Sequence, residues 1–234
     1  MTRLNEHGQP VGEPVPGWEA RPAPTRVVLT GHHVRLEPVA SAHAPDLFDA
    51  LCGADDAPLW TYRPGTMPAD RAELAETLRV AETSATVVTF AIVPLGGRAQ
   101  GLASLMRVDA AQGCVEVGSI IWSRALQRTR AATEALTLLA RHVFDDLGYR
   151  RLEWKCDSLN EPSRVAAARL GFTYEGRFRQ AFVYHGRNRD TDWFSIVDAE
   201  WPAVRAAYDA WLDPSNFDAG GAQRRRLSVL TAQR

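Results

Sequence analysis

Basic side chains gather in a short loop that precedes a strongly predicted helix. Arg124, Arg128 and Arg130 occur within one seven-residue stretch. The first turn of a helix has unpaired backbone N–H groups and the positive end of the helix dipole, so it favours an anion. The loop is therefore a candidate phosphate-binding site. Solvated arginines at a strand–helix turn are an equally good interpretation.

Two further polar groups flank this loop in the sequence. Glu116 belongs to a predicted strand, 114–122, with Gly118 at its centre, where glycine often marks a bulge. Downstream, the segment Asn160–Ser163 combines a capping residue with an early proline and opens a helix. A positioned carboxylate or hydroxyl can take part in proton transfer. A solvated glutamate, a helix cap and a first-turn polar serine are the alternatives.

Strands and helices alternate around these residues. The most regular segment is the helix 129–147, in which apolar residues recur at spacings of three and four. Segment 151–157 alternates apolar and polar side chains, as in a half-buried strand. The remaining strands are expected at 27–29, 34–38, 86–93, 100–108, 114–122, 174–184 and 191–197, and the remaining helices at 43–52, 68–84, 160–170 and up to Trp211. This order predicts a mixed sheet with helices on both faces.

Composition restricts the class of protein. Of the 234 residues, 45% are hydrophobic and 24% are charged, which is typical of a globular chain. A formal net charge of −1 argues against a nucleic-acid-binding protein. Cys52, Cys114 and Cys156 are odd in number and widely spaced, so they indicate neither a disulfide framework nor a zinc site. No signal peptide or membrane span is indicated, and we expect a cytoplasmic protein without metal.

The two ends of the chain differ from its centre. Residues 1–26 contain five prolines and no apolar period, which predicts an extended arm. Residues 213–234 contain a glycine pair and three consecutive arginines and predict a loosely held tail. The working domain is therefore expected to be 27–212.

An ordered series of short motifs resembles a known enzyme family. Gln127, Arg130 and Ala132 match a loop of the form Gln/Arg-x-x-Gly-x-Gly/Ala, except that Arg130 stands where glycine is usual. The other matching segments are Glu116–Gly118, Asn160–Ser163, Arg169–Phe172, Glu175-Gly176 with Arg179, and Gly186–Asp190 before Ser195. Over about 34–197 the chain resembles the GNAT superfamily of N-acetyltransferases, specifically its RimJ/RimL-like branch.

The resemblance implies a fold and a co-substrate. The fold is a single GNAT-type domain of mixed α/β class, whose central, mostly antiparallel sheet has about seven strands with helices on both faces. The co-substrate is acetyl-CoA, and no metal is implied. The residues that the resemblance and the loop chemistry point to for binding it are Ile120, Ile121, Gln127, Arg128, Thr129, Arg130, Ala131, Ala132, Asn160 and Ser163.

The implied reaction is attack of an unprotonated amine on the thioester of acetyl-CoA. Glu116 is expected to be the base, and Ser163 is expected to donate a hydrogen bond to the departing thiolate. Backbone N–H groups of Gly118 or Ser119 could stabilise the oxyanion. The residues expected near the acceptor are Trp60, Tyr62, Glu116 and Tyr184. Tyr174 and Tyr184 are alternative acids, although packing roles suit both better.

The expected acceptor is a primary amine, first a protein N-terminus and second a small-molecule amine. The partners are then acetyl-CoA and this amine, with no nucleic acid and no membrane, and a homodimer is left open. A CoA-binding sensor or structural homologue without catalysis is the alternative. Turnover of acetyl-CoA with a panel of amines separates the two.

Overall fold

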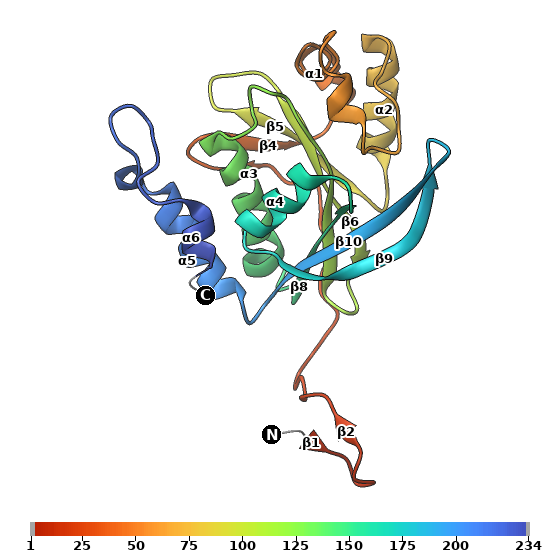
Figure 1. Cartoon of the computed structure of the whole chain (residues 1–234), viewed down its shortest axis with the longest axis vertical. Coiled ribbons are helices and arrows are strands. Elements are labelled where there is room, and N and C mark those ends of the chain that lie inside the picture. Colours follow the sequence, from red (N-terminus) through yellow and green to blue (C-terminus); the bar gives the residue numbers. More distant parts are fainter. Residues whose placement is uncertain (1–2, 233–234) are drawn as a thin grey trace.

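The computed structural model describes residues 3–232, which are built around one twisted eight-stranded sheet (Figure 1). Its strand order is β3-β4-β5-β6-β7-β8-β10-β9, and all neighbours are antiparallel except β7 and β8. The strands are β3 (Leu29–Thr30), β4 (Val34–Pro38), β5 (Val88–Pro94), β6 (Gly101–Asp109), β7 (Cys114–Trp122), β8 (Arg151–Asp157), β9 (Thr173–Tyr184) and β10 (Arg187–Val197). The expected mixed α/β class is confirmed, with eight strands in place of about seven.

Helices cover both faces of this sheet (Figure 1). One face packs against α1 (Ala44–Leu51) and α2 (Arg71–Thr83), and the other against α3 (Arg130–Arg141), α4 (Glu161–Arg169), α5 (Trp201–Leu212) and α6 (Leu227–Thr231). Residues of β5 alternate between the two cores: Phe90 and Ile92 pack on the α3 side, and Ala91 and Val93 on the α1 side. Short 3₁₀ turns are η1 (Ser41–His43), η2 (Ala57–Trp60) and η4 (Pro214–Asn216).

The helix predicted over 129–147 is present in two parts. After α3 the chain continues as one π-helical turn, η3 (His142–Asp146). His142 in this turn has a buried side chain whose Nδ1 lies 2.8 Å from a carboxylate oxygen of Asp146. The carboxylate four residues on gives the buried ring nitrogen its polar partner.

The N-terminal arm is only partly extended. Its strands β1 (Arg3–Leu4) and β2 (Pro10–Val11) form a separate two-stranded sheet that projects away from the main sheet (Figure 1). Trp18 then anchors the arm to the body, because its indole Nε1 donates to the carbonyl of Ala111 at 2.9 Å. The Arg21 guanidinium lies 4.6 Å from the centroid of the Trp18 ring.

The C-terminal segment is held against the core within its described residues, 213–232, so the expectation of a loosely held tail is wrong there. Leu227 is fully buried, and Phe217 and Leu230 are also part of the core beside α5. Thr231 Oγ1 donates to the carbonyl of Arg169 at the end of α4 (3.2 Å). These few apolar side chains were enough to fix a segment whose glycines and arginines are typical of a mobile tail.

Candidate functional site

The sheet opens at its centre, between the parallel strands β7 and β8. The two strands pair only from Cys114–Arg151 to Glu116–Glu153. Beyond that point both strands line a cavity of about 1400 Å³. One half of it, here called the cofactor end, is bordered by α3, α4 and the C-terminal segment. The other, the acceptor end, is bordered by residues 58–64 and by the β9–β10 hairpin.

A bulge in β7 lies at the opening. Ser119 has a φ of 49°, and the register with β6 shifts between Gly118 and Ile121. The bulge expected near Gly118 is therefore present. A Cβ on Gly118 would lie 2.7 Å from Oε1 of Glu116 and 2.8 Å from the sulfur of Met106. Glycine is thus what allows the Glu116 carboxylate to fold over the strand.

The cofactor end begins at the first turn of α3. Thr129 caps this helix, because its Oγ1 accepts from the N–H of Ala132 at 3.1 Å. The preceding Arg128 has a φ of 64°, and Gln127 Nε2 donates to the carbonyl of Trp122 at 3.0 Å. The N–H of Arg130 has no acceptor within residues 3–232. The loop is therefore built by its own backbone and cap, and it leaves a helix N-terminus to attract an anion.

Seven of the ten predicted cofactor-binding residues line the cavity: Ile120, Ile121, Gln127, Arg128, Ala132, Asn160 and Ser163. Thr129, Arg130 and Ala131 are not among the lining residues. The guanidinium of Arg130 instead stacks on the ring of Phe217, 3.6 Å from its centroid. The residue that departs from the family loop is thus engaged by the C-terminal segment.

Sequence reasoning named Arg169 only within a matching segment and gave this basic residue no binding role. Arg169 lines the cavity, donates to Thr133 Oγ1 at 3.3 and 3.2 Å, and lies 5.2 Å from the Trp211 ring centroid. Burial lowers the pKa of its guanidinium. No carboxylate lies within 4.0 Å of it in residues 3–232. Its place at the end of the helix predicted over 160–170 was visible in the sequence, but the direction of its side chain was not.

The start of α4 combines capping with cavity-lining groups. Asn160 Oδ1 accepts from the N–H of Ser163 at 3.2 Å, so Asn160 is a helix cap. Ser163 Oγ accepts from Nε1 of the buried Trp154 at 3.0 Å. The Ser163 hydroxyl also lies beside the Cys156 thiol, whose pKa burial raises to about 11. Ser163 is thereby held at the cavity wall with a hydroxyl proton to donate.

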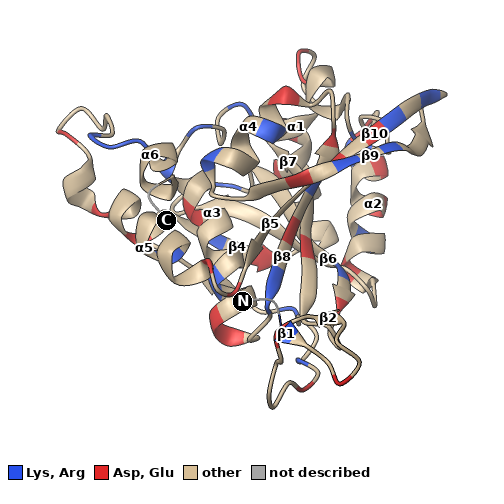
Figure 2. Ribbon diagram, turned by 60° about the horizontal axis from the view of Figure 1, so that its bottom comes forward, with Lys and Arg blue, Asp and Glu red and all other residues tan. Residues whose placement is uncertain are grey.

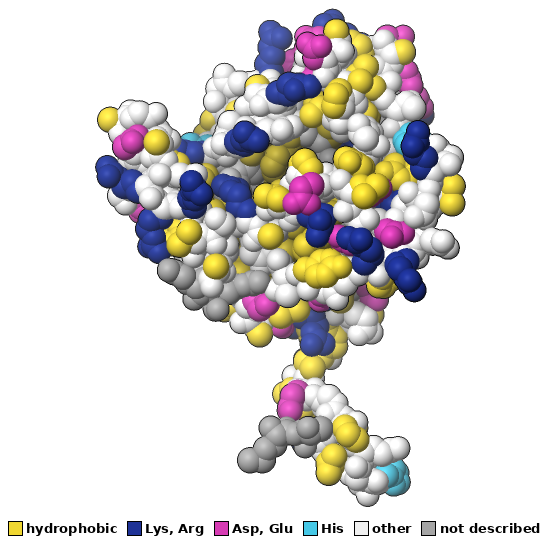
Figure 3. All heavy atoms as spheres, viewed as in Figure 1, with side chains coloured by type: hydrophobic (Ala, Val, Ile, Leu, Met, Phe, Trp, Pro, Cys, Tyr) yellow, Lys and Arg dark blue, Asp and Glu magenta, His cyan; other side chains and the backbone are white. Residues whose placement is uncertain are grey.

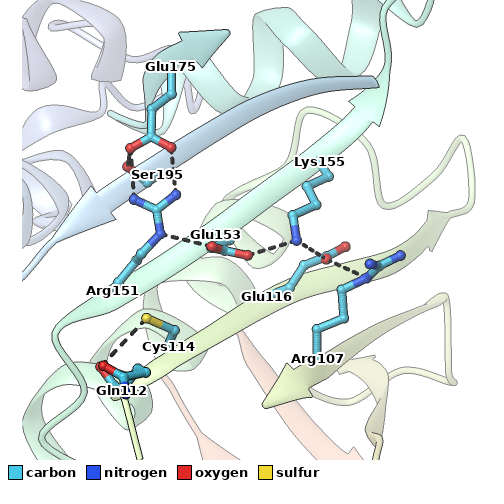
Figure 4. Close-up of polar contacts among 9 residues, drawn as sticks. All are labelled: Arg107, Gln112, Cys114, Glu116, Arg151, Glu153, Lys155, Glu175 and Ser195. Carbon is cyan, nitrogen blue, oxygen red and sulfur yellow. Dashed lines mark hydrogen bonds and ion pairs between the residues drawn. The ribbon is translucent and has the colours of Figure 1, made fainter. Parts of the chain in front are cut away.

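A chain of ion pairs runs from the acceptor end across the sheet (Figure 4). Glu116 Oε2 lies 3.1 Å from Arg107 Nε and 3.1 Å from Lys155 Nζ. Lys155 also contacts Glu153 at 2.8 Å, and Glu153 pairs with Arg151 at 2.8 Å. Burial raises the pKa of Glu116, and its pairs with Lys155 and Arg107 offset this only in part. A raised pKa brings this carboxylate closer to the range in which a general base works.

The aromatic residues expected near the acceptor fall into two groups. Tyr62 and Tyr184 line the cavity, whereas Trp60 does not: its Nε1 donates to the carbonyl of Leu51, and it packs on the α1 side. Tyr184 OH donates to Asp157 Oδ2 at 2.6 Å, and burial with this carboxylate raises the pKa of Tyr184 to about 12. Tyr62 OH donates to the carbonyl of Leu159 at 3.0 Å. These two phenols join the walls of the acceptor end.

Two negative findings concern the described residues alone. Within 3–232, no three His, Cys, Asp or Glu side chains come together as metal ligands would. In the same residues, no helix has the length and apolar character needed to cross a bilayer.

Comparison with known proteins agrees with this geometry. The model of the acetyltransferase (GNAT) domain matches residues 33–173. A GCN5-related N-acetyltransferase from Brucella melitensis is 45% identical, with a TM-score of 0.91 over 93% of this chain and 100% of that one. A probable acetyltransferase of the GNAT family from Chromobacterium violaceum is 35% identical, with a TM-score of 0.77 over 83% of this chain and 98% of that one.

A curated relative adds a weaker match. YdaF of Bacillus subtilis, whose name proposes a ribosomal N-acetyltransferase, is 28% identical over 43% of this chain and 55% of its own length. The match thus spans about half of that relative's length. The name of this relative agrees with the RimJ/RimL-like resemblance. The domain match, the two solved structures and the opened sheet lead to one conclusion: this chain belongs to the GNAT family of acetyltransferases.

Proposed function

We propose that this protein transfers the acetyl group of acetyl-CoA to a primary amine, by direct attack of the amine on the thioester. The observation that supports this most is the meeting, in one cavity, of a helix N-terminus, a bulged strand and a buried carboxylate. Acetyl-CoA supplies an activated acyl group when bound. A protein N-terminus is one acceptor to test, for which the name of YdaF suggests ribosomal proteins, and a small-molecule amine is the other.

The cofactor end fits a long, anionic thioester. The start of α3 with Arg128 and Arg169 would hold the phosphates, because both residues line the cavity beside a helix N-terminus. Backbone groups of β7 that lack a partner on β8 would bond to the amides of the pantetheine arm. Asn160 and Ser163 would lie along the same arm.

The chemistry would fall to three groups of this chain. Glu116 would hold the acceptor ammonium and take its proton, directly or through a water. A backbone N–H at the Gly118–Ser119 bulge would donate to the oxyanion. Ser163 Oγ–H would donate to the departing sulfur. Arg107 and Lys155 would orient the Glu116 carboxylate.

Acetyl-CoA turnover, followed by thiol release with a panel of primary amines, tests this proposal. The expected result is transfer to at least one amine, confirmed by a mass gain of one acetyl group. CoA binding without transfer to any amine would favour the alternative, a CoA-binding sensor. We further propose a cytoplasmic location and a working domain of 27–212 to which residues 213–232 are docked.

A further inference from the structure

The walls of the acceptor end carry more positive than negative charge. Five of the described lining residues there are basic and two are acidic. The basic ones are Arg63, Arg107, Lys155, Arg179 and Arg189, and the acidic ones are Glu116 and Asp157. Figure 3 shows basic and apolar side chains side by side over the region of the β9–β10 hairpin, and Figure 2 shows Lys and Arg positions along its strands.

Both acidic side chains already have partners within the protein. Glu116 is shared between Arg107 and Lys155, both at 3.1 Å. Asp157 accepts from Tyr184 OH at 2.6 Å and from the N–H of Leu159 at 2.8 Å. The remaining basic groups of this end are therefore not neutralised by the walls.

Arg63 is the clearest example. Its Nη1 donates to two carbonyl oxygens of the bulged strand, of Ser119 at 3.0 Å and of Ile120 at 3.2 Å. No carboxylate within residues 3–232 lies within 4.0 Å of it. Burial without a counter-ion lowers the pKa of this guanidinium to about 10. An anion placed beside Arg63 would relieve that cost.

Arg189 provides a second cation close to the reacting groups. Its guanidinium lies 5.5 Å from the centroid of the Phe182 ring, and the guanidinium of Arg107 lies 5.9 Å from the same centroid. Arg107 in turn contacts Glu116. Arg189 Nε donates to Thr191 Oγ1 at 3.2 Å, and no carboxylate of residues 3–232 lies within 4.0 Å of the Arg189 guanidinium. Arg179 differs from these two arginines, because its charge interacts with the carboxylate of Asp190.

We propose that the acceptor carries a carboxylate close to its reacting amine and that Arg63 and Arg189 bind this carboxylate. This rests on the proposed amine acetylation. Positive walls repel a lone ammonium group but attract a molecule in which a carboxylate accompanies it. The same charges favour the neutral form of the amine, which is the form that reacts. An acidic amino acid or the N-terminus of an acidic peptide would supply such an acceptor.

Matched acceptors test the proposal. Initial rates of acetyl-CoA turnover are compared for amidated Ala-Asp-Asp, Ala-Asn-Asn and Ala-Lys-Lys peptides, and for free aspartate against aspartate diamide. We expect kcat/KM to be about tenfold higher for the acidic member of each set, as for a charge-assisted hydrogen bond. The preference should shrink as salt is raised. The arm with the higher rate tells whether a peptide or a free amino acid is the better source.

Variants assign the preference to the proposed residues. Arg189→Gln and Arg63→Gln should each reduce the acidic preference to about twofold or less, and Arg189→Lys should keep most of it. Arg98→Gln, on the β5–β6 turn and outside the cavity, is the matched control and should leave the preference unchanged. An acidic preference that survives both glutamine variants would overturn the assignment.

The charge preference and the amine acetylation can be tested separately. Equal rates with acidic and neutral amines, or faster rates with basic ones, would overturn the charge preference while amine acetylation stands. Should no amine be acetylated, binding of the N-acetylated peptides to the enzyme with CoA, measured by calorimetry, decides the preference separately. Tighter binding of the acidic peptide would support it, and equal binding would overturn it.

Discussion

The two ends of the cavity are built in different ways. At the cofactor end, the groups that could meet a ligand are set by local backbone: the Thr129 cap, the β7 bulge and the Asn160 cap. At the acceptor end they are side chains from distant segments, such as Arg63 and Glu116. Backbone-built sites follow from short motifs, whereas a site made of side chains exists only once the whole sheet has formed. Changes at the acceptor end should therefore affect chemistry, and changes at the cofactor end should affect affinity.

The largest effect is expected from Glu116→Gln. The variant keeps the shape and removes the basicity, so kcat/KM at neutral pH should fall by about two to four orders of magnitude. Because the base acts deprotonated, wild-type activity should fall as the pH drops through the raised pKa of Glu116. The deficit of the variant should shrink as the pH rises and the amine loses its own proton.

A pH–rate profile of both enzymes makes this measurement. Glu153→Gln is the matched control, because Glu153 also contacts Lys155 but does not line the cavity. Profiles of Glu116→Gln and wild type that overlay would mean that the acceptor end holds no base at this position.

Next in size is a loss of stability at the C-terminal segment that borders the cofactor end. Leu227→Ala should lower the free energy of unfolding by about 2–5 kcal/mol, because Leu227 is fully buried. Val229→Ala in the same short helix is the control: Val229 is 49% exposed, and its change should stay within about 0.5 kcal/mol. Denaturant unfolding measures both. Equal small effects would show that the segment does not belong to the cooperative unit.

Ser163→Ala should separate binding from chemistry at the border of the two ends. We expect kcat to fall roughly tenfold to a thousandfold while the Kd for CoA changes little, since the hydroxyl would act on the developing thiolate. The variant also leaves Trp154 Nε1 without its acceptor, a cost to stability of about 1–3 kcal/mol. Ser163→Thr keeps a hydroxyl and should recover activity. Wild-type kcat in Ser163→Ala would contradict the assignment.

The smallest effect is expected in cofactor affinity. Arg169→Gln should raise the Kd for CoA about tenfold, the size of one charge-assisted hydrogen bond. Arg130→Gln should change it little, because Arg130 stacks on Phe217 outside the cavity. Calorimetry compares the two variants. A stronger loss in Arg130→Gln would restore the phosphate-binding role that its place in the loop motif suggested.

What could be predicted from the sequence follows the same division. The family loop and the helix start at Asn160–Ser163 depend on neighbours in the chain, and Gln127, Arg128 and Asn160 from these segments line the cavity. Their role in binding the cofactor stays a prediction. Local spacing also predicted β7 and β8 with their observed bounds.

The rest depends on contacts between distant segments. Arg130 was assigned to the loop, but Phe217, far along the chain, turns its guanidinium away. Trp60 was placed near the acceptor by its family region, yet its indole bonds to Leu51 and joins the other core. Arg63 has no distinctive spacing, and Arg189 was named only as part of the matching segment Gly186–Asp190, without a binding role.

The opening between β7 and β8 also bears on aggregation. A strand edge with free N–H and C=O groups normally invites pairing with another chain. Here such edges lie in the middle of the sheet, between helices on both faces and beneath the residues 58–64 that bond to β7 and to the hairpin. A slender ligand can enter this slot, whereas a second β-sheet is too broad to do so. At this opening, backbone groups are therefore available for recognition without the central strand edges being open to pairing with a second chain.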